Sequence, residues 1–456
     1  MSNFVSLSTA LSALRSAQTG IDVAAHNISN ANTAGYTRQR VNLTASSPIQ
    51  MQIGSMGTGV TVEGINRIRD TFLDMRLHAS NSNLGALEVK ADLLARTESL
   101  LGEPEFGITK ELNEVWAAFD ELSLRPTDKS VRLAVLTALD TLAGRTRTIS
   151  ASLSALGADV GLQLKDAVAK ANDELTQLAD LNRSIASIQG GGDGVPNDLL
   201  DRRDVLVDSL SRTLGVTSTY AEDGSVKVNL SGFDLVSGPR VNLLALQPDN
   251  TIQHTTGTTL TTGGRIRGLQ DYVAAGTGVL AGVQARMESF VNELVTQINT
   301  QHDAGIDANG NSPLGPPTVN VLLTGTAATL AVGFTDPDLL AAAAPGAGGL
   351  DGTNALALGT LRTVPIVGRP LVDEEVRGMI TDLGAQVASA RRQAAAEDGL
   401  NAAAAAARRD HSAVSLDEEM VALMTFQRSY EAAARVATAV DEALETIVNR
   451  LGIVGR

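Results

Sequence analysis

The sequence predicts a mainly α-helical protein, with N- and C-terminal helices paired as a coiled coil, a long helical bundle as the middle domain and a small inserted β-rich domain. Apolar residues recur at alternating steps of three and four near both ends of the 456-residue chain, which is the spacing of helices that pack lengthwise. Between residues 216 and 265 the apolar period changes to two, which is typical of strands.

The first helix is expected to end in a polar run that begins at Asn27. Asn, Thr and Gly residues between Asn27 and Gly35 favour local turns in which side chains bond the backbone. An extended segment follows, with glycines at its turns. The predicted seam of this helix consists of Phe4, Leu7, Leu11, Leu14, Ile21, Ala25 and Ile28.

The middle domain is expected to be helical and to comprise residues 46–215 and 266–410. Long apolar stripes at near-heptad spacing predict its helices. Glycine weakens a helix interior, so Gly157 and Gly161 are candidate breaks.

The β-rich domain is expected at residues 216–265. An Asp-Gly turn at Asp223 lies between two runs of alternating apolar residues, which predicts a hairpin. By contrast, segment 302–352 is rich in Gly, Ala and Pro, and its pattern predicts no regular structure.

The last helix has the clearest pattern in the chain. Ser415 and Glu418 form a capping-box pattern at its start. We expect residues 1–45 and 411–456 to form one discontinuous coiled-coil domain. The predicted C-terminal seam consists of Leu423, Phe426, Tyr430, Ala433, Ala437, Val440, Leu444, Ile447, Leu451 and Val454.

Composition excludes several function classes. The net charge of -15 argues against nucleic acid and anionic membrane surfaces as partners. The chain has no cysteine, so disulfides, thiolate metal sites and cysteine nucleophiles are excluded. No apolar stretch is long enough to insert into a membrane, and no signal peptide is visible, so ordinary routes predict a cytoplasmic protein.

No pattern predicts a catalytic, cofactor or metal site. Asp307, Asn309 and Asn311 resemble the start of a calcium loop, but Ser312 replaces the required Gly and Thr318 the bidentate Glu, so a turn is expected. The charge cluster at residues 201–204 is expected to be a solvated helix face. We therefore predict that the protein is not an enzyme and uses no cofactor.

Two motifs resemble one known family. The run Asn-Ile-Ser-Asn-Ala-Asn-Thr-Ala-Gly-Tyr at 27–36 resembles the motif shared by axial proteins of the bacterial flagellum, namely rod, hook and hook-associated proteins. Residues 424–436 resemble the C-terminal helix of that family. Four interior segments are similar to the hook-associated branch that joins the hook to the filament: 198–207, 223–226, 263–269 and 354–358.

The resemblance implies a structural role at the hook–filament junction. It implies an inner coiled-coil tube of terminal helices, a surrounding helical domain and an outward-facing β-rich domain. It also implies export through the flagellar type III channel without a cleaved signal peptide, and an extracellular location. The implied partners are further copies in a ring or tube, the hook protein, a second junction protein, the flagellin side of the filament and an export chaperone at the C-terminal region.

Two alternatives remain open at this point: a hook or filament subunit of the same family, and a cytoplasmic coiled-coil regulator of flagellar export. The C-terminal seam can pack within the chain as an ordinary helix hairpin, against neighbouring subunits, or both. The predicted subunit-interface residues are Phe4, Leu7, Leu11, Leu14, Ile21, Asn27, Ile28, Asn30, Asn32, Gly35, Tyr36, Leu423, Phe426, Tyr430, Val440, Leu444, Ile447 and Leu451.

Overall fold

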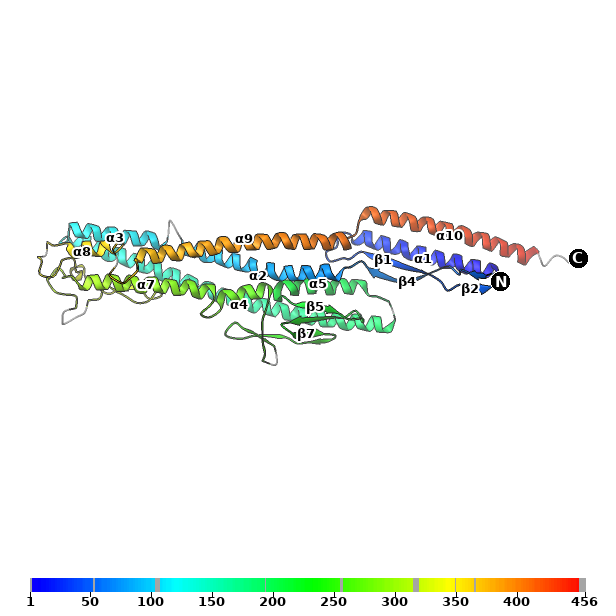
Figure 1. Cartoon of the computed structure of the whole chain (residues 1–456), viewed down its shortest axis with the longest axis horizontal. Coiled ribbons are helices and arrows are strands. Elements are labelled where there is room, and N and C mark those ends of the chain that lie inside the picture. Colours follow the sequence, from blue (N-terminus) through cyan, green and yellow to red (C-terminus); the bar gives the residue numbers. More distant parts are fainter. Residues whose placement is uncertain are drawn as a thin grey trace.

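The computed structural model shows an elongated molecule with both chain ends at the same end of its long axis (Figure 1). The side chains of Phe4 and Ile447 and all of Leu451 and Val454 lie outside the described residues. The structure describes residues 2–51, 54–102, 107–192, 194–254, 257–314, 320–348, 350–364 and 366–450, with the backbone alone at 2–4, 51 and 447–450.

The two terminal helices lie side by side at one end of the molecule, as the coiled-coil prediction requires (Figure 1). They are α1 (Ser2–Asn30) and α10 (Leu416–Arg450). Strand β1 (Gln39–Ala45) pairs antiparallel with β4 (Val60–Arg67) and packs on α1. The short strands β2 (Ile49–Met51) and β3 (Gly54–Met56) extend this hairpin. We call α1, β1–β4 and α10 the terminal unit.

The remaining helices form a long bundle, which we call the helical body together with the β-sheets that it carries. Helix α2 packs lengthwise on α9, and α3 packs on α4 and α8. The helices of the bundle are α2 (Thr71–Leu101), α3 (Ile108–Leu124), α4 (Lys129–Gly191), α5 (Asn197–Leu214), α6 (Gly264–Val273), α7 (Val279–Asp303), α8 (Thr353–Thr360) and α9 (Val372–Ser412).

Helix α4 is continuous over 63 residues, so neither of the candidate breaks, Gly157 and Gly161, interrupts it. Gly157 instead permits close packing, since a Cβ there would lie 2.6 Å from the side chain of Leu280 on α7. The cost of glycine in a helix is about 1 kcal/mol, which tertiary packing of a long apolar stripe readily offsets. The helix ends at Gly192, whose φ of 78° suits glycine.

The predicted β-rich insert is confirmed as two small antiparallel sheets that pack on α4. The side chain of Asn182 bonds both backbone groups of Val226, at 2.9 Å to the N–H and 2.8 Å to the carbonyl. One sheet contains β5 (Thr217–Tyr220), β6 (Val226–Leu230), β7 (Phe233–Ser237) and β8 (Arg240–Val241); the other contains β9 (Leu244–Leu246), β10 (Ile252–His254) and β11 (Thr259–Leu260).

Segment 302–352, whose sequence pattern predicts no regular structure, is held against the helices by polar side chains. Asn299 on α7 bonds both backbone groups of Leu323, at 2.9 and 2.7 Å. Buried Arg132 on α4 donates to the carbonyl of Leu340 at 2.6 Å. The short elements here are β12 (Leu323–Thr324), β13 (Ala331–Val332) and the 3₁₀ helix η1 (Pro337–Leu339).

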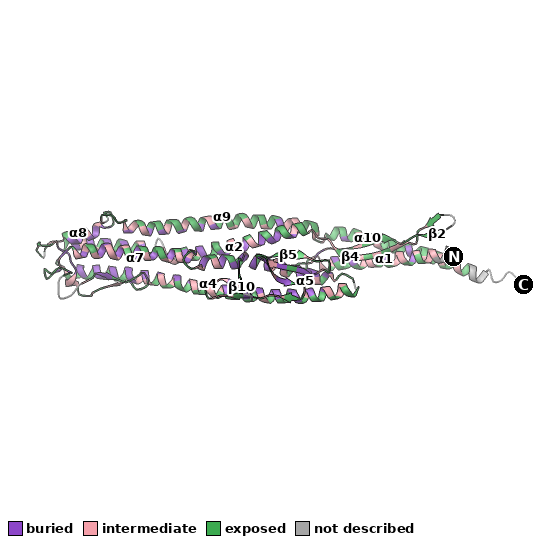
Figure 2. Ribbon diagram, turned by 60° about the horizontal axis from the view of Figure 1, so that its bottom comes forward, coloured by how far each residue is buried: buried purple, intermediate pink, exposed green. Residues whose placement is uncertain are grey.

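The contiguous apolar core belongs to the helical body alone. It extends in sequence from Val89 to Ala390 and includes Trp116, Phe119 and Phe290. Figure 2 shows the buried residues along the facing sides of these helices. Among the described residues of the terminal unit, none is part of this core. The two parts of the molecule are therefore not joined by a shared apolar interior.

Candidate functional site

The candidate site is the terminal unit, where both family-like motifs lie. Helix α10 packs on a face of α1 that is made of small side chains, including Ala10, Ala17 and Ala24. Gly20 lies on the same face, and a Cβ there would approach the ring of Phe426 to 2.5 Å. Glycine at this position therefore sets how closely the two helices approach.

The predicted seam of α10 lies on the side that packs against α1. Ala433 on this stripe is buried. The other described seam residues are half-buried, except Tyr430, which is 39% exposed. The half-buried members are Leu423, Phe426, Ala437, Val440 and Leu444.

The predicted seam of α1 differs from the face that α10 covers. Most of its residues are only half-buried, and Leu11 is 44% exposed. The half-buried members are Leu7, Leu14, Ile21 and Ile28. At 3.6 residues per turn, the centre of this leucine-rich stripe lies about a quarter of a turn from that of the small-residue face. Small side chains let the two backbones come closer, so α10 covers them and leaves the larger apolar side chains of the stripe only partly buried.

Asn27, at the end of α1, is the centre of a buried hydrogen-bond cluster and is 1% exposed. Its amide nitrogen donates to the Gln39 carbonyl at 2.9 Å and to Glu419 Oε2 at 3.0 Å. Its amide oxygen accepts from the Gln39 N–H at 3.0 Å and from the Tyr36 hydroxyl at 2.7 Å. Both polar atoms of the amide are thus satisfied within the chain, which explains the requirement for Asn.

Tyr36 stays a neutral donor in this cluster. Burial raises the pKa of its hydroxyl above the ordinary value, and the nearby carboxylates of Asp201, Asp198 and Glu419 raise that pKa further. The hydroxyl also lies 3.0 Å from His26 Nδ1. The predicted interface residue Tyr36 is therefore engaged within its own chain.

Other residues of the same motif shape the turn after α1. Gly35 has a φ of 81°, and a Cβ there would lie 2.4 Å from the side chain of Val205 on α5. Asn30 donates from its amide to the His26 carbonyl at 3.0 Å, whereas Asn32 is exposed. The motif thus acts locally as a compact turn pressed against the helical body.

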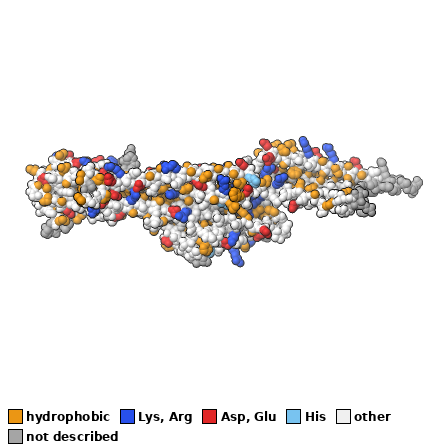
Figure 3. Space-filling model, in the orientation of Figure 1, with side chains coloured by type: hydrophobic (Ala, Val, Ile, Leu, Met, Phe, Trp, Pro, Cys, Tyr) orange, Lys and Arg blue, Asp and Glu red, His pale blue; other side chains and the backbone are white. Residues whose placement is uncertain are grey.

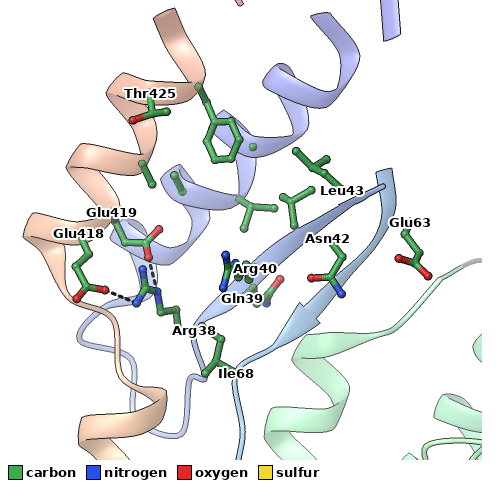
Figure 4. A pocket seen from close by; sticks show the side chains of 16 residues that line it. Arg38, Gln39, Arg40, Asn42, Leu43, Glu63, Ile68, Glu418, Glu419 and Thr425 are labelled. Atoms are coloured by element: carbon green, nitrogen blue, oxygen red, sulfur yellow. Dashed lines mark hydrogen bonds and ion pairs between the residues drawn. The ribbon is translucent and has the colours of Figure 1, made fainter. Parts of the chain in front are cut away.

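Arg38 connects this turn to the start of α10, as Figure 4 shows. Its guanidinium donates to Glu419 Oε1 at 2.6 Å and to Glu418 Oε2 at 2.5 Å. Partial burial would lower the pKa of Arg38, but the two carboxylates outweigh it and raise that pKa. Glu418, predicted to cap α10, binds Arg38 with its carboxylate.

A groove of about 800 Å³ opens between α1, α10 and the hairpin of β1 and β4 (Figure 4). Its walls combine apolar groups with charged ones. The apolar lining includes Val23, Ala24, Val41, Leu43, Ala422 and Phe426, and the charged lining consists of Arg38, Arg40, Glu63, Glu418 and Glu419.

The charge cluster on α5 corrects one prediction. The pattern at residues 201–204 predicts a solvated face, but Asp201, Arg203 and Asp204 are 7%, 3% and 5% exposed. Arg67 at the end of β4 bonds Asp201 at 2.6 Å and Asp204 at 2.8 Å. The partners come from segments far away in sequence, so the local pattern could not reveal the burial.

Two structural findings bear on other function classes. Within the part of the chain that the structure describes, no three His, Asp or Glu side chains gather as metal ligands. None of the described helices combines the length and the apolar composition that a membrane span requires. The predicted turn at Asp307 is confirmed, since its carboxylate accepts from the backbone N–H groups of Asn309 and Asn311, both at 2.8 Å.

Three families match successive parts of the chain. Residues 94–315 match the family described as flagellar hook-associated protein FlgK helical domain. Residues 7–37 match the flagella basal body rod protein family, and residues 410–451 match the C-terminal family of the flagellar basal body rod FlgEFG proteins. The two terminal matches coincide with α1 plus its turn and with α10.

Individual relatives agree with these matches. Flagellar hook-associated protein 1 of Bacillus subtilis (strain 168) is 30% identical over 509 aligned positions, which cover all of both chains. The Escherichia coli (strain K12) protein of the same name is 27% identical over 67% of this chain and 58% of its own length. The solved structure of the flagellar hook junction protein FlgK from Burkholderia pseudomallei covers 74% of this chain with a TM-score of 0.62 and 18% identity, which shows a shared fold. The chain therefore belongs to the flagellar hook-associated protein 1 family of structural flagellar proteins.

Proposed function

We propose that this protein joins the flagellar hook to the filament, and that the terminal unit makes its contacts with further copies and with neighbouring axial proteins. Membership of the hook-associated protein 1 family supports the junction role. The similar Burkholderia protein, which shares the fold, is named a flagellar hook junction protein. The role is interfacial and needs no catalytic chemistry, so the protein is not an enzyme.

One observation gives the strongest support for placing the subunit contacts in the terminal unit. The leucine-rich stripe of α1 carries the larger apolar side chains, yet α10 leaves Leu11 exposed and the other described large side chains of the stripe only half-buried. Met420, Val421 and Met424 on α10 are also between 47% and 59% exposed. Apolar side chains are interspersed with charged ones over this end of the molecule (Figure 3). Large apolar side chains exposed on both terminal helices support an interaction surface at this end of the molecule.

The same proposal includes the wider arrangement that the resemblance implies. The predicted coiled-coil domain of residues 1–45 and 411–456 is the assembling part, together with strands β2–β4 of the terminal unit. The helices of the bundle form the surrounding domain, and residues 216–265 form the outer β-rich domain. Copies assemble as a ring or tube between the hook protein and the second junction protein on the flagellin side. The chain reaches the cell exterior through the flagellar export channel without a cleaved signal peptide, and an export chaperone binds its C-terminal region beforehand.

The decisive experiment is complementation of a strain that lacks the gene, scored by electron microscopy and by flagellin in the spent medium. The deletion strain should show bare hooks and lose flagellin to the medium. Missing hooks would assign the protein to the rod or hook instead. Normal filaments, with the protein retained in the cytoplasm, would favour the export regulator.

Leu11→Gln tests the interface within this assay. The Leu11 side chain is 44% exposed, so the substitution should leave the isolated protein as stable as before while preventing filament formation. Leu162→Gln, at a 61% exposed position on α4, is the matched control and should restore filaments. Normal filaments with Leu11→Gln would contradict the assignment of the leucine-rich stripe to subunit contacts.

A further inference from the structure

Few chain segments and few apolar contacts connect the terminal unit to the helical body. The chain passes between the two parts at residues 68–70 and 413–415. The contiguous apolar core stops at the helical body, as described above. What lies between the two parts is a set of buried and half-buried charged side chains, supplied by β4, the 68–70 connection, α2, α5 and α9.

Arg67 and Arg69 reach from the terminal side of this boundary into the body. Arg67 binds Asp201 and Asp204 on α5 at 2.6 and 2.8 Å, and all three side chains are at most 9% exposed. Arg69 binds Asp74 on α2 at 2.6 Å and also contacts Asp204. Two arginines close together in the chain thus hold carboxylates of two different helices.

Further pairs on the body side extend this set of charges. Arg408, near the end of α9, binds Asp208 through two hydrogen bonds of 3.0 and 2.8 Å. His78 on α2 lies 2.9 Å from Asp208. Burial alone would raise the pKa of Asp208, but the hydrogen bonds from His78 and Arg408 outweigh it and lower that pKa.

The set extends to the β-rich insert through Arg203. This guanidinium binds Asp204 at 2.8 Å, lies 4.7 Å from the centre of the Tyr220 ring, and donates to the Gly224 carbonyl. Burial lowers the pKa of Arg203 to about 10. The charges balance, because four arginines (67, 69, 203 and 408) meet four aspartates (74, 201, 204 and 208).

Backbone groups of the terminal unit complete the boundary. The Thr37 N–H donates to Asp201 Oδ2 at 3.1 Å. Asn197 on α5 donates to the Ile65 carbonyl at 2.9 Å and to Gln39 Oε1 at 3.3 Å. The body therefore binds both strands of the hairpin as well as the arginine side chains.

We propose that these eight charged residues form an electrostatic joint that fixes the terminal unit at one angle to the helical body. Apolar surfaces tolerate sliding, whereas buried ion pairs require directed geometry. A shift of the hairpin would leave desolvated charges without partners, which is strongly unfavourable. Neutralising the joint should therefore free the terminal unit as a whole, while the core from Val89 to Ala390 keeps the body folded.

Spin-label distance measurements on the full chain test this joint. The sequence has no cysteine, so Glu63→Cys on β4 and Ser187→Cys on α4, both exposed, provide the only labelling sites. Double electron–electron resonance should give one narrow distance distribution. Adding Asp201→Asn and Asp204→Asn should widen it at least twofold, with the helical circular-dichroism signal unchanged.

The control and a second variant keep the test decisive. Asp173→Asn with Asp180→Asn removes the same number of charges from the exposed side of α4 and should leave the distribution narrow. If the α5 variant fails to fold, Arg67→Met decides, because Asp204 keeps Arg69 and Arg203 as partners. A broad distribution in the unsubstituted chain, or an unchanged width in the folded joint variants, would overturn the proposal.

Discussion

The side-chain amide of Asn27 donates a hydrogen bond to Glu419 at 3.0 Å, although the two residues are 392 positions apart in the chain. This bond fixes the end of α1 beside the start of α10. Because Arg38 binds the other oxygen of the same carboxylate at 2.6 Å, Glu419 connects the turn after α1 to the last helix. One carboxylate therefore sets the relative position of three segments.

Asn27→Asp should destabilise the terminal unit by about 3 kcal/mol, because it replaces the amide donor with a second buried carboxylate next to Glu419. Hydrogen exchange followed by mass spectrometry should show faster exchange in α1 and α10 and no change in α4. Asn30→Asp is the matched control, since the Asn30 amide bonds only local atoms. Equal exchange in both variants would refute the role assigned to Asn27.

Gly20→Ala should weaken the α1–α10 contact by about 1–3 kcal/mol, since a Cβ would lie 2.5 Å from the Phe426 ring. Gly161→Ala is the control: no heavy atom lies within 4 Å of the place that its methyl group would take, and alanine favours helix there. Proteolysis of the termini should become faster for the first variant alone. Adding Phe426→Leu should partly restore resistance; a slower cleavage of Gly20→Ala itself would argue against close packing.

Leu444→Asp should prevent filament formation and leave the helical body folded. The side chain is half-buried on the seam of α10, far in sequence from the core of the body. The melting temperature of the body should change by no more than about 1 °C, because the two units do not share a core. Leu444→Met is the control and should assemble. Filaments of normal length in the aspartate variant would exclude this part of the seam from assembly.

Acid should destabilise the far end of the body through His302. Its Nε2 accepts from the Ala341 N–H at 3.0 Å, and burial lowers its pKa to about 4. Between the ordinary pKa of about 6.5 and this value, the unfolded chain binds a proton that the folded chain does not. Stability is therefore complete above about pH 6.5 and falls as the pH drops to 4, by roughly 2–3 kcal/mol.

Denaturant unfolding at pH 7.5 and 4.5 measures this loss. His302→Gln keeps an acceptor for Ala341 but cannot be protonated, so its stability should depend less on pH over the same interval. An identical pH dependence in both proteins would show that another group is responsible.

The pairing of the terminal helices and the inserted strands could be predicted from the sequence because both depend on local period. The seam through Phe426 and Val440 and the alternation through Val226 and Val228 are visible in one stretch of chain. The face of α1 that meets α10 was not predictable in this way. Large side chains dominate the apolar periodicity of the sequence. The distance between the two helices, by contrast, depends on Gly20 and its alanine neighbours.

The local sequence pattern also could not predict that Asp201 and Asp204 are buried. Alternating charges on a helix are usually solvated, and only the approach of Arg67 from more than a hundred positions away removes the water. In the same way, segment 302–352 has a pattern typical of a loop, yet the side chains of Asn299 and Arg132 hold its backbone through a few hydrogen bonds. Long-range polar contacts produce no periodic pattern in the sequence.

The pairing of α1 with α10 also determines the order in which the chain can fold. The core from Val89 to Ala390 lies wholly between the two terminal helices, so its contacts can form while residue 416 and beyond are still absent. Helix α1, by contrast, pairs with the last helix made, so its contacts join the two ends of the chain. Closing so large a loop is entropically costly and slow. During synthesis, the first helix therefore has only the hairpin of β1 and β4 to pack on, and lacks its partner helix until nearly the whole chain exists.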